Sequence, residues 1–213
     1  MNYKKLLPIM GDNFAKPPMH FPLDDEGIYI ELFADIPQAD FQKNLDEVMA
    51  RNKVNWSVSG YLEKRAVILK NYPQMVLQER FYHLGIDINA PCATKLSAPF
   101  DSEVVLSEYE QGEGNYGGVI VLKCQTQPNA QPFYLLFGHL NPDSLPDIGN
   151  VIKAGEVFAE LGNMNQNGNW YYHTHLQVLT QKAFDEGWAS KGYCKKSEIA
   201  TIDEFCPNPF KFL

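Results

Sequence analysis

The chain has 213 residues, 45% of them hydrophobic and 21% charged, a length and composition that allow a buried core without disulfide or metal staples. Lys and Arg total 18 against 26 Asp and Glu, which gives a formal net charge of −8. This balance argues against nucleic acid as a partner and gives no support for docking to a membrane. No stretch approaches the ~20 apolar residues of a membrane span. The apolar run within Met1–Met10 is short and interrupted by Pro8, unlike a signal-peptide core, so we expect a cytoplasmic protein.

The cysteines show no paired spacing that would indicate a zinc ribbon or a redox motif. In an acidic chain expected in the cytoplasm, we predict reduced thiols packed as small hydrophobic residues. The four are Cys92, Cys124, Cys194 and Cys206.

Residues 1–75 are expected to form an N-terminal extension of mixed helix and loop. Its clearest element is a helix over Pro37–Asn52, because apolar residues recur there at helical spacing and proline suits the first turn. The apolar positions are Phe41, Leu45, Val48 and Met49. We interpret them as a packing stripe.

Residues 76–182 are expected to form a β domain, because short runs rich in Val, Ile, Leu and Tyr alternate with glycine-rich turns. The predicted strands are Glu103–Glu110, Gly118–Thr126, Phe133–Leu140, Val157–Leu161 and Trp170–Thr180, with a turn over Gln127–Pro132. The fold class is therefore mainly β, an antiparallel sheet or sandwich. Residues 183–213 are expected to form a tail that packs on this core.

Alternation within one predicted strand assigns side chains to faces. Residues two apart on a strand project from the same face. The strand Phe133–Leu140 is therefore expected to place Phe133, Leu135, Phe137 and His139 together.

Four of the five histidines fall between His83 and His175, whereas His20 lies outside this pattern. In a strand, His173 and His175 share a face, and so do His83 and Asp87 if their segment is extended. Imidazoles with one carboxylate are a donor set that suits zinc. With His139 there are five candidate groups, more than a metal site needs, and the surplus fits three ligands plus two proton-handling histidines.

Other metal motifs do not occur. A cupin-type site would place a glutamate where Val178 and Leu179 stand, and neither His-x-His-x-Asp-His nor His-Glu-x-x-His is present.

The motifs in order are His83-x-x-x-Asp87, Ala98-Pro99-Phe100-Asp101-Ser-Glu-Val104-Val105, Phe137-Gly-His139-Leu, the glycine-bearing stretch Val151–Gly162, and His173-Thr-His175-Leu-Gln-Val. This combination resembles the lysostaphin/LytM-type zinc metallopeptidases. The resemblance implies His83, Asp87 and His175 as zinc ligands and His139 and His173 as the catalytic pair. It also implies a small antiparallel sheet domain with the site in a groove.

The chain departs from the family pattern at Ser102, Phe137, Thr174 and Leu176, none of which is an implied ligand or catalytic residue. A narrower similarity, carried by Arg80-x-x-His83-Leu-Gly-Ile-Asp, by Gln166-Asn-Gly168-Asn-Trp170 before His173 and by Pro207-Asn-Pro209, is to peptidase-like domains fused to class III aminotransferases.

The function expected from the resemblance is hydrolysis of a peptide bond by a zinc-activated water. The family's substrates imply a peptide or a peptidoglycan-like peptide as the partner. Two alternatives remain: a non-catalytic or regulatory metal-binding module of the same fold, and a hydrolase of a non-peptide amide.

Overall fold

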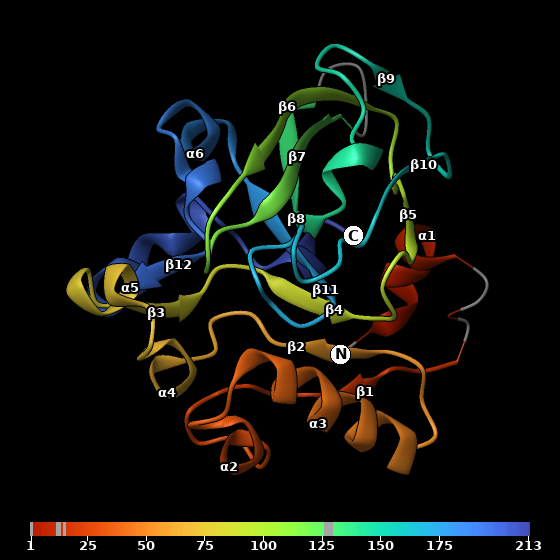
Figure 1. Ribbon diagram of the computed structural model, residues 1–213. Coiled ribbons are helices and arrows are strands. Elements are labelled where there is room, and N and C mark those ends of the chain that lie inside the picture. Colours follow the sequence, from red (N-terminus) through yellow and green to blue (C-terminus); the bar gives the residue numbers. More distant parts are fainter. Residues whose placement is uncertain (1, 12–13, 15, 126–129) are drawn as a thin grey trace.

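The computed structural model describes residues 2–11, 14, 16–125 and 130–213 (Figure 1). Its largest element is an eight-stranded sheet in the order β1-β2-β4-β11-β8-β7-β6-β9. These strands are β1 (Met19–His20), β2 (Ser57–Ser59), β4 (Ile86–Asn89), β6 (Ser102–Glu110), β7 (Gly117–Cys124), β8 (Phe133–Leu140), β9 (Val151–Ile152) and β11 (His173–Leu179). All neighbours pair antiparallel except β1 and β2, which are parallel. The predicted mainly β class is confirmed, with a mixed sheet.

Two short antiparallel ribbons flank this sheet. One pairs β5 (Lys95–Ser97) with β10 (Val157–Glu160), and the other pairs β3 (Arg80–His83) with β12 (Tyr193–Lys195). The second ribbon matters for function because β3 ends at a site histidine.

The helices are short apart from one. The α-helices are α1 (Leu7–Met10), α2 (Ile30–Phe33), α3 (Gln38–Arg51), α4 (Ala66–Leu69), α5 (Pro73–Leu77) and α6 (Gln181–Asp185). The 3-10 turns are η1 (Tyr3–Leu6), η3 (Pro142–Ser144), η4 (Trp188–Ser190), η5 (Lys196–Glu204) and η6 (Pro209–Lys211). No helix among the described residues is long and apolar enough to cross a membrane. The cytoplasmic location stays a prediction.

Most of the elements predicted from the sequence lie within a residue or two of their expected bounds. Helix α3 follows Pro37 and is capped at Asn52, and its four predicted apolar positions are all buried. The strands β6, β7, β8 and β10 match their predicted ranges closely, whereas β11 begins at His173, three residues later than predicted. Of the predicted turn over 127–132, residues 127–129 lie outside the described residues, as does Thr126.

The two faces of the central strands contact different hydrophobic clusters. Ile86, Ile88, Leu176 and Val178 join a core that also contains α1 and the β5–β10 ribbon. The other face of the sheet packs against residues between 183 and 206, including Ala183 of α6. Because successive side chains alternate, the positions between the apolar residues of β4 and β11 are free to build a site.

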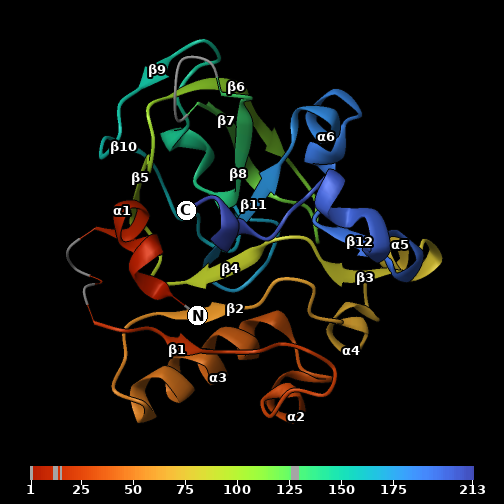
Figure 2. The same ribbon diagram turned by 180° about the vertical axis from the view of Figure 1, so that it is seen from behind.

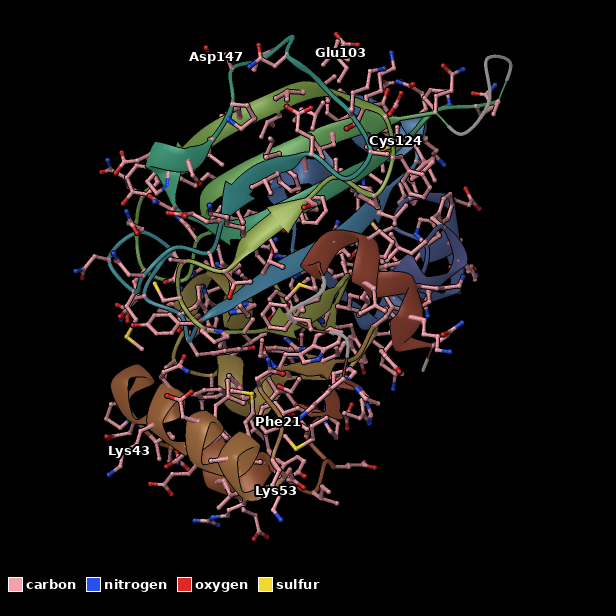
Figure 3. All side chains as sticks on the ribbon, turned by 90° about the vertical axis from the view of Figure 1, so that its right-hand side faces the viewer. Phe21, Lys43, Lys53, Glu103, Cys124 and Asp147 are labelled. Atoms are coloured by element: carbon pink, nitrogen blue, oxygen red, sulfur yellow. The ribbon has the colours of Figure 1, made fainter. Side chains whose placement is uncertain are left out.

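A third cluster lies under the β1–β2 end of the sheet. Figures 1 and 2 show α3 and α2 at this end, with β9 at the opposite end. The apolar stripe of α3 packs there with Trp170 and Tyr171, which directly precede β11. Figure 3 shows Phe21 on the sheet side of α3, and Lys43 and Lys53 on its outer side. The N-terminal segment therefore reaches the chain beside the histidines.

The division into an extension 1–75, a domain 76–182 and a tail 183–213 stays a prediction. Strands β1 and β2 of the first segment belong to the large sheet. In the last segment, Phe210, Phe212 and Leu213 pack against the core, and the Phe212 ring lies 5.1 Å from that of Phe133.

Candidate metal centre and catalytic residues

Three neighbouring strands of the sheet carry most of the predicted site. In the β11–β4 register His175 lies opposite Asp87, and in the β11–β8 register it lies opposite Gly138. His139 is therefore adjacent to Gly138, the residue of β8 that faces His175. His173 lies two residues before His175 on β11. Pairing of strands that are distant in sequence brings these side chains together.

His83 reaches the group from a different strand. The chain forms β3, bends at Leu84 and Gly85, and resumes as β4, so the predicted extended segment is interrupted. A Cβ on Gly85 would lie 2.5 Å from the backbone oxygen of Leu176 and 2.8 Å from Cε1 of His175. Glycine thus permits the close approach that returns His83 to Asp87, whose Oδ1 lies 3.1 Å from His83 Nε2.

The hydrogen-bond partners of two rings fix where their protons lie. His83 Nδ1 faces the backbone oxygen of Gly60 at 2.9 Å, and His175 Nε2 faces Oε1 of Gln177 at 2.8 Å. Both partners are acceptors, so each neutral ring places its single proton there. The opposite nitrogens, His83 Nε2 and His175 Nδ1, are then unprotonated.

These unprotonated nitrogens point at one another and at a carboxylate. His83 Nε2 and His175 Nδ1 are 2.8 Å apart, and Asp87 Oδ1 lies 3.3 Å from His175 Nδ1. The three residues offer ligand atoms that all lie within 4.8 Å of one another. Tetrahedral ligands at ~2.0–2.1 Å from a zinc ion are separated by about 3.3 Å. Three converging lone pairs at such spacing repel each other unless a cation lies among them, so the donor set fits a metal ion.

The electrostatics keep His83 neutral and the Asp87 carboxylate charged. Burial, aided by the nearby Arg65 charge, lowers the pKa of His83 to about 4. Burial raises the pKa of Asp87, but His83 and Arg65 outweigh it and hold that pKa well below its usual value. Neutral imidazole and ionised carboxylate are the forms that bind metal.

His139 and His173 form a second pair, and both rings make the same kind of hydrogen bond through Nδ1. His139 Nδ1 faces the backbone oxygen of Asn167 at 2.9 Å, and His173 Nδ1 faces that of Tyr171 at 2.8 Å. Each ring therefore keeps Nδ1 protonated and leaves Nε2 free to accept a proton. The rings lie 4.3 Å apart. Burial lowers the pKa of both, to about 4 for His173 and well below the usual value for His139.

The backbone at His139 corrects the predicted face assignment. Phe133, Leu135 and Phe137 share one core, but Leu140 joins that core in place of His139. His139 has φ of 64°, a left-handed conformation rare for a non-glycine residue, and its ring lies 5.7 Å from that of Tyr116. This twist breaks the alternation and turns His139 towards the other site residues. Strain of this kind gathers at functional sites.

Aromatic side chains cover the site. The Tyr171 ring stacks on His173 at 4.2 Å and on Phe41 of α3 at 4.5 Å. Trp170 lies 5.9 Å from His139 and stacks on Tyr72. A cavity of about 90 Å³ remains, lined by site histidines, Asp87 and neighbours including Tyr116, Trp170 and Arg80.

Several residues to which the sequence analysis assigned no role hold the site in place. Gln177 supports His175, and its even offset on β11 could have indicated this. Arg65 donates to Asp87 Oδ2 at 2.6 Å from a segment more than twenty residues away, and no local pattern signals that contact. Asn167 positions the loop before β11 by accepting from the Trp170 N–H through Oδ1. His20 is exposed on β1 and is not part of the metal-binding group.

The cysteines are all free. Burial raises the pKa of each of the three buried thiols, Cys124, Cys194 and Cys206, to about 12. Cys92 differs from the predicted packing because it is exposed.

The fold and site therefore define a β-sheet protein with a His–Asp–His metal group beside a histidine pair. Residues 81–186 match the model of peptidase family M23, over just under half of the chain. This match confirms the lysostaphin/LytM-type resemblance, whereas the aminotransferase-fusion similarity is not confirmed. No curated protein is detectably similar in sequence.

Three solved structures illustrate the relationship. The catalytic domain of the antimicrobial peptidase lysostaphin from Staphylococcus simulans is 16% identical over 57% of this chain and 80% of that one, with a TM-score of 0.41. LytU is 22% identical over 58% of this chain and 74% of that one, with a TM-score of 0.39. A zinc-containing peptidase from Vibrio cholerae is 21% identical over 47% of this chain and only 28% of that one, with a TM-score of 0.39. Because these TM-scores are all below 0.5, the resemblance to family M23 depends on the match of residues 81–186 and not on these structures.

Proposed function

We propose that the chain is a zinc-dependent metallopeptidase that hydrolyses an amide bond within a peptide. The proposal depends on the convergence of three atoms: His83 Nε2, His175 Nδ1 and Asp87 Oδ1. The two imidazole nitrogens are unprotonated, because each ring carries its proton on the other nitrogen, which faces an acceptor. Two nitrogens and one oxygen form a set that zinc prefers, and three protein ligands leave a position for a substrate or water. The M23 match supports the same assignment.

The proposed ligands are His83, Asp87 and His175. Zinc bound there would lower the pKa of a water molecule and polarise the substrate carbonyl. The contacts to Gly60 and Gln177 keep the two imidazoles oriented for this task, as hydrogen bonds behind metal ligands generally do.

His139 and His173 are the proposed catalytic pair. Each offers an unprotonated Nε2 and is anchored through Nδ1 to a backbone carbonyl. One Nε2 takes the proton of the attacking water as general base, and the resulting imidazolium can return it to the leaving amine. The Tyr116 hydroxyl, or the second ring once it carries a proton on Nε2, can donate a hydrogen bond to the tetrahedral oxyanion, since Tyr116 lines the cavity and its hydroxyl has no hydrogen-bond partner among the described residues.

The walls of the cavity bear on the substrate class. Tyr116 and Trp170 line it, with ring centroids 5.7 and 5.9 Å from that of His139. Small residues beside the cleaved bond can approach the histidine pair without displacing these rings. We propose peptides rich in glycine or alanine, peptidoglycan-type peptides among them, as substrates.

Two variants separate the roles of the neighbouring histidines. After purification with zinc, the wild type should carry one equivalent of metal. His175→Ala should lose the metal, whereas His173→Ala should keep it and lose turnover of glycine-rich peptides or murein fragments. Emptying of the site by His173→Ala but not by His175→Ala would refute the role assignment. Metal binding without turnover of any such substrate would favour a non-catalytic module instead.

A further inference from the structure

The two carboxylate oxygens of Asp87 face different surroundings. Oδ1 faces the ring nitrogens, at 3.1 Å from His83 Nε2 and 3.3 Å from His175 Nδ1. Oδ2 accepts from Arg65 Nη1 at 2.6 Å and from the Tyr171 hydroxyl at 3.4 Å. One oxygen is thus directed at the metal position and the other at fixed donors.

Arg65 is itself held rigidly. Its side chain is 2% exposed, and its Nε and Nη2 donate to Glu63 Oε2 at 3.2 and 2.9 Å. Glu63 is fixed in turn, because its oxygens accept from the backbone N–H groups of Gly60 at 2.5 Å and Leu23 at 3.2 Å. The contacts with Glu63 therefore fix the planar guanidinium in the orientation in which Nη1 donates to Asp87.

Charge balance does not require the contact between Arg65 and Asp87. Glu63 already neutralises Arg65 within hydrogen-bond distance. The negative charge of Asp87 therefore remains available to a cation. A buried ion pair stabilises a fold weakly, since desolvation offsets most of its attraction, and one established use of such a pair is to impose specific geometry.

We infer that Arg65, held by Glu63, is a positioning residue that restricts Asp87 to ligating the metal through Oδ1 alone. A carboxylate can bind a metal through one or both oxygens. Donation to Oδ2 from an arginine and a tyrosine removes the second option and keeps a coordination position open for the reaction. The inference rests on the proposed metal site and assigns a role there to the segment that precedes the M23 match.

Cobalt(II) substitution tests this arrangement, because the visible absorption of cobalt weakens when its coordination number rises above four. The informative variant is Glu63→Gln/Arg65→Met, which removes both charges together, so that Glu63 is not left as a buried carboxylate without its arginine. Arg65→Lys is the conservative variant, which keeps a cationic donor. Arg80→Met is the matched control: it removes an arginine that lines the cavity, but Arg80 makes no ion pair with Asp87 among the described residues.

The wild type, Arg65→Lys and Arg80→Met should show strong four-coordinate absorption at one equivalent of cobalt. The double variant should lose at least half of that molar absorptivity at full loading, because Oδ2 is released. Unchanged absorptivity in a folded, fully loaded double variant overturns the inference, and so does a folded double variant that binds no cobalt. A wild type that binds neither cobalt nor zinc overturns the proposed function and the inference with it.

A crystal structure of the zinc-loaded wild type provides a measurement that needs no variant. The inference requires a zinc bond to Oδ1 and continued donation from Arg65 to Oδ2. Two zinc–oxygen bonds to Asp87 would refute it.

Discussion

Gln177 offers a sharp test of the metal centre because it contacts the site through a single hydrogen bond. Its Oε1 accepts from His175 Nε2 at 2.8 Å, and its Nε2 donates to Cys206 Sγ at 3.2 Å. Gln177→Leu preserves the approximate volume but removes the acceptor. His175 is 2% exposed, so no water replaces it. The ring must either leave Nε2–H unpaired or move its proton to Nδ1, the atom proposed to bind the metal.

The expected magnitude follows from these two options. An unpaired buried donor costs about 1–3 kcal/mol, and loss of a hydrogen bond behind a metal ligand lowers metal affinity roughly 10–100-fold. Such a loss corresponds to about 1.4–2.8 kcal/mol of binding free energy. Competition with a chromogenic chelator should therefore show a zinc Kd raised by that factor. Urea unfolding of the metal-free protein should show a lower free energy of unfolding.

Thr174→Val is the matched control in the same strand. Thr174 is adjacent to His175 but on the opposite face, and its Oγ1 donates to the backbone oxygen of Gly138 at 3.0 Å. Its loss should cost about 1 kcal/mol of stability while leaving the zinc Kd unchanged. If Gln177→Leu folds and binds zinc within threefold of the wild type, the proton placement on His175 is wrong.

Three further predictions address packing, pH and thiol reactivity. Gly85→Ala should destabilise the metal-free protein by about 1–3 kcal/mol in urea unfolding and weaken zinc binding, because overpacking against the fixed backbone oxygen of Leu176 forces strain; wild-type stability and affinity would contradict the close approach. The pKa of about 4 for buried His83 and His173 lies below the unfolded value of about 6.5. The unfolded state therefore takes up protons first on acidification, and metal-free stability should fall by about 2 kcal/mol per histidine between pH 7 and pH 5; equal free energies of unfolding at the two pH values would exclude this. Iodoacetamide should modify one thiol of the native protein, the exposed Cys92, and mass-spectrometric labelling of two or more would show that the buried thiols are accessible.

The sequence alone determined the β class, helix α3 and the identity of the His–Asp–His group. These features follow from short-range regularities. A helical stripe repeats within four residues, a strand alternates every two, and the family motifs place His83 four residues before Asp87 and His173 two before His175. Such patterns remain visible without knowing which strands are neighbours.

Only the tertiary structure decided which atoms serve the site. The proton positions on His83 and His175 depend on Gly60 and Gln177, and the single free oxygen of Asp87 depends on Arg65. Gly60 and Arg65 belong to the β2–α4 region, which reaches the site because β2 pairs with β4. The left-handed backbone that turns His139 is likewise imposed by its neighbours rather than by its own preference. Contacts between segments so far apart leave no periodic trace in the sequence, because they arise from strand order and packing.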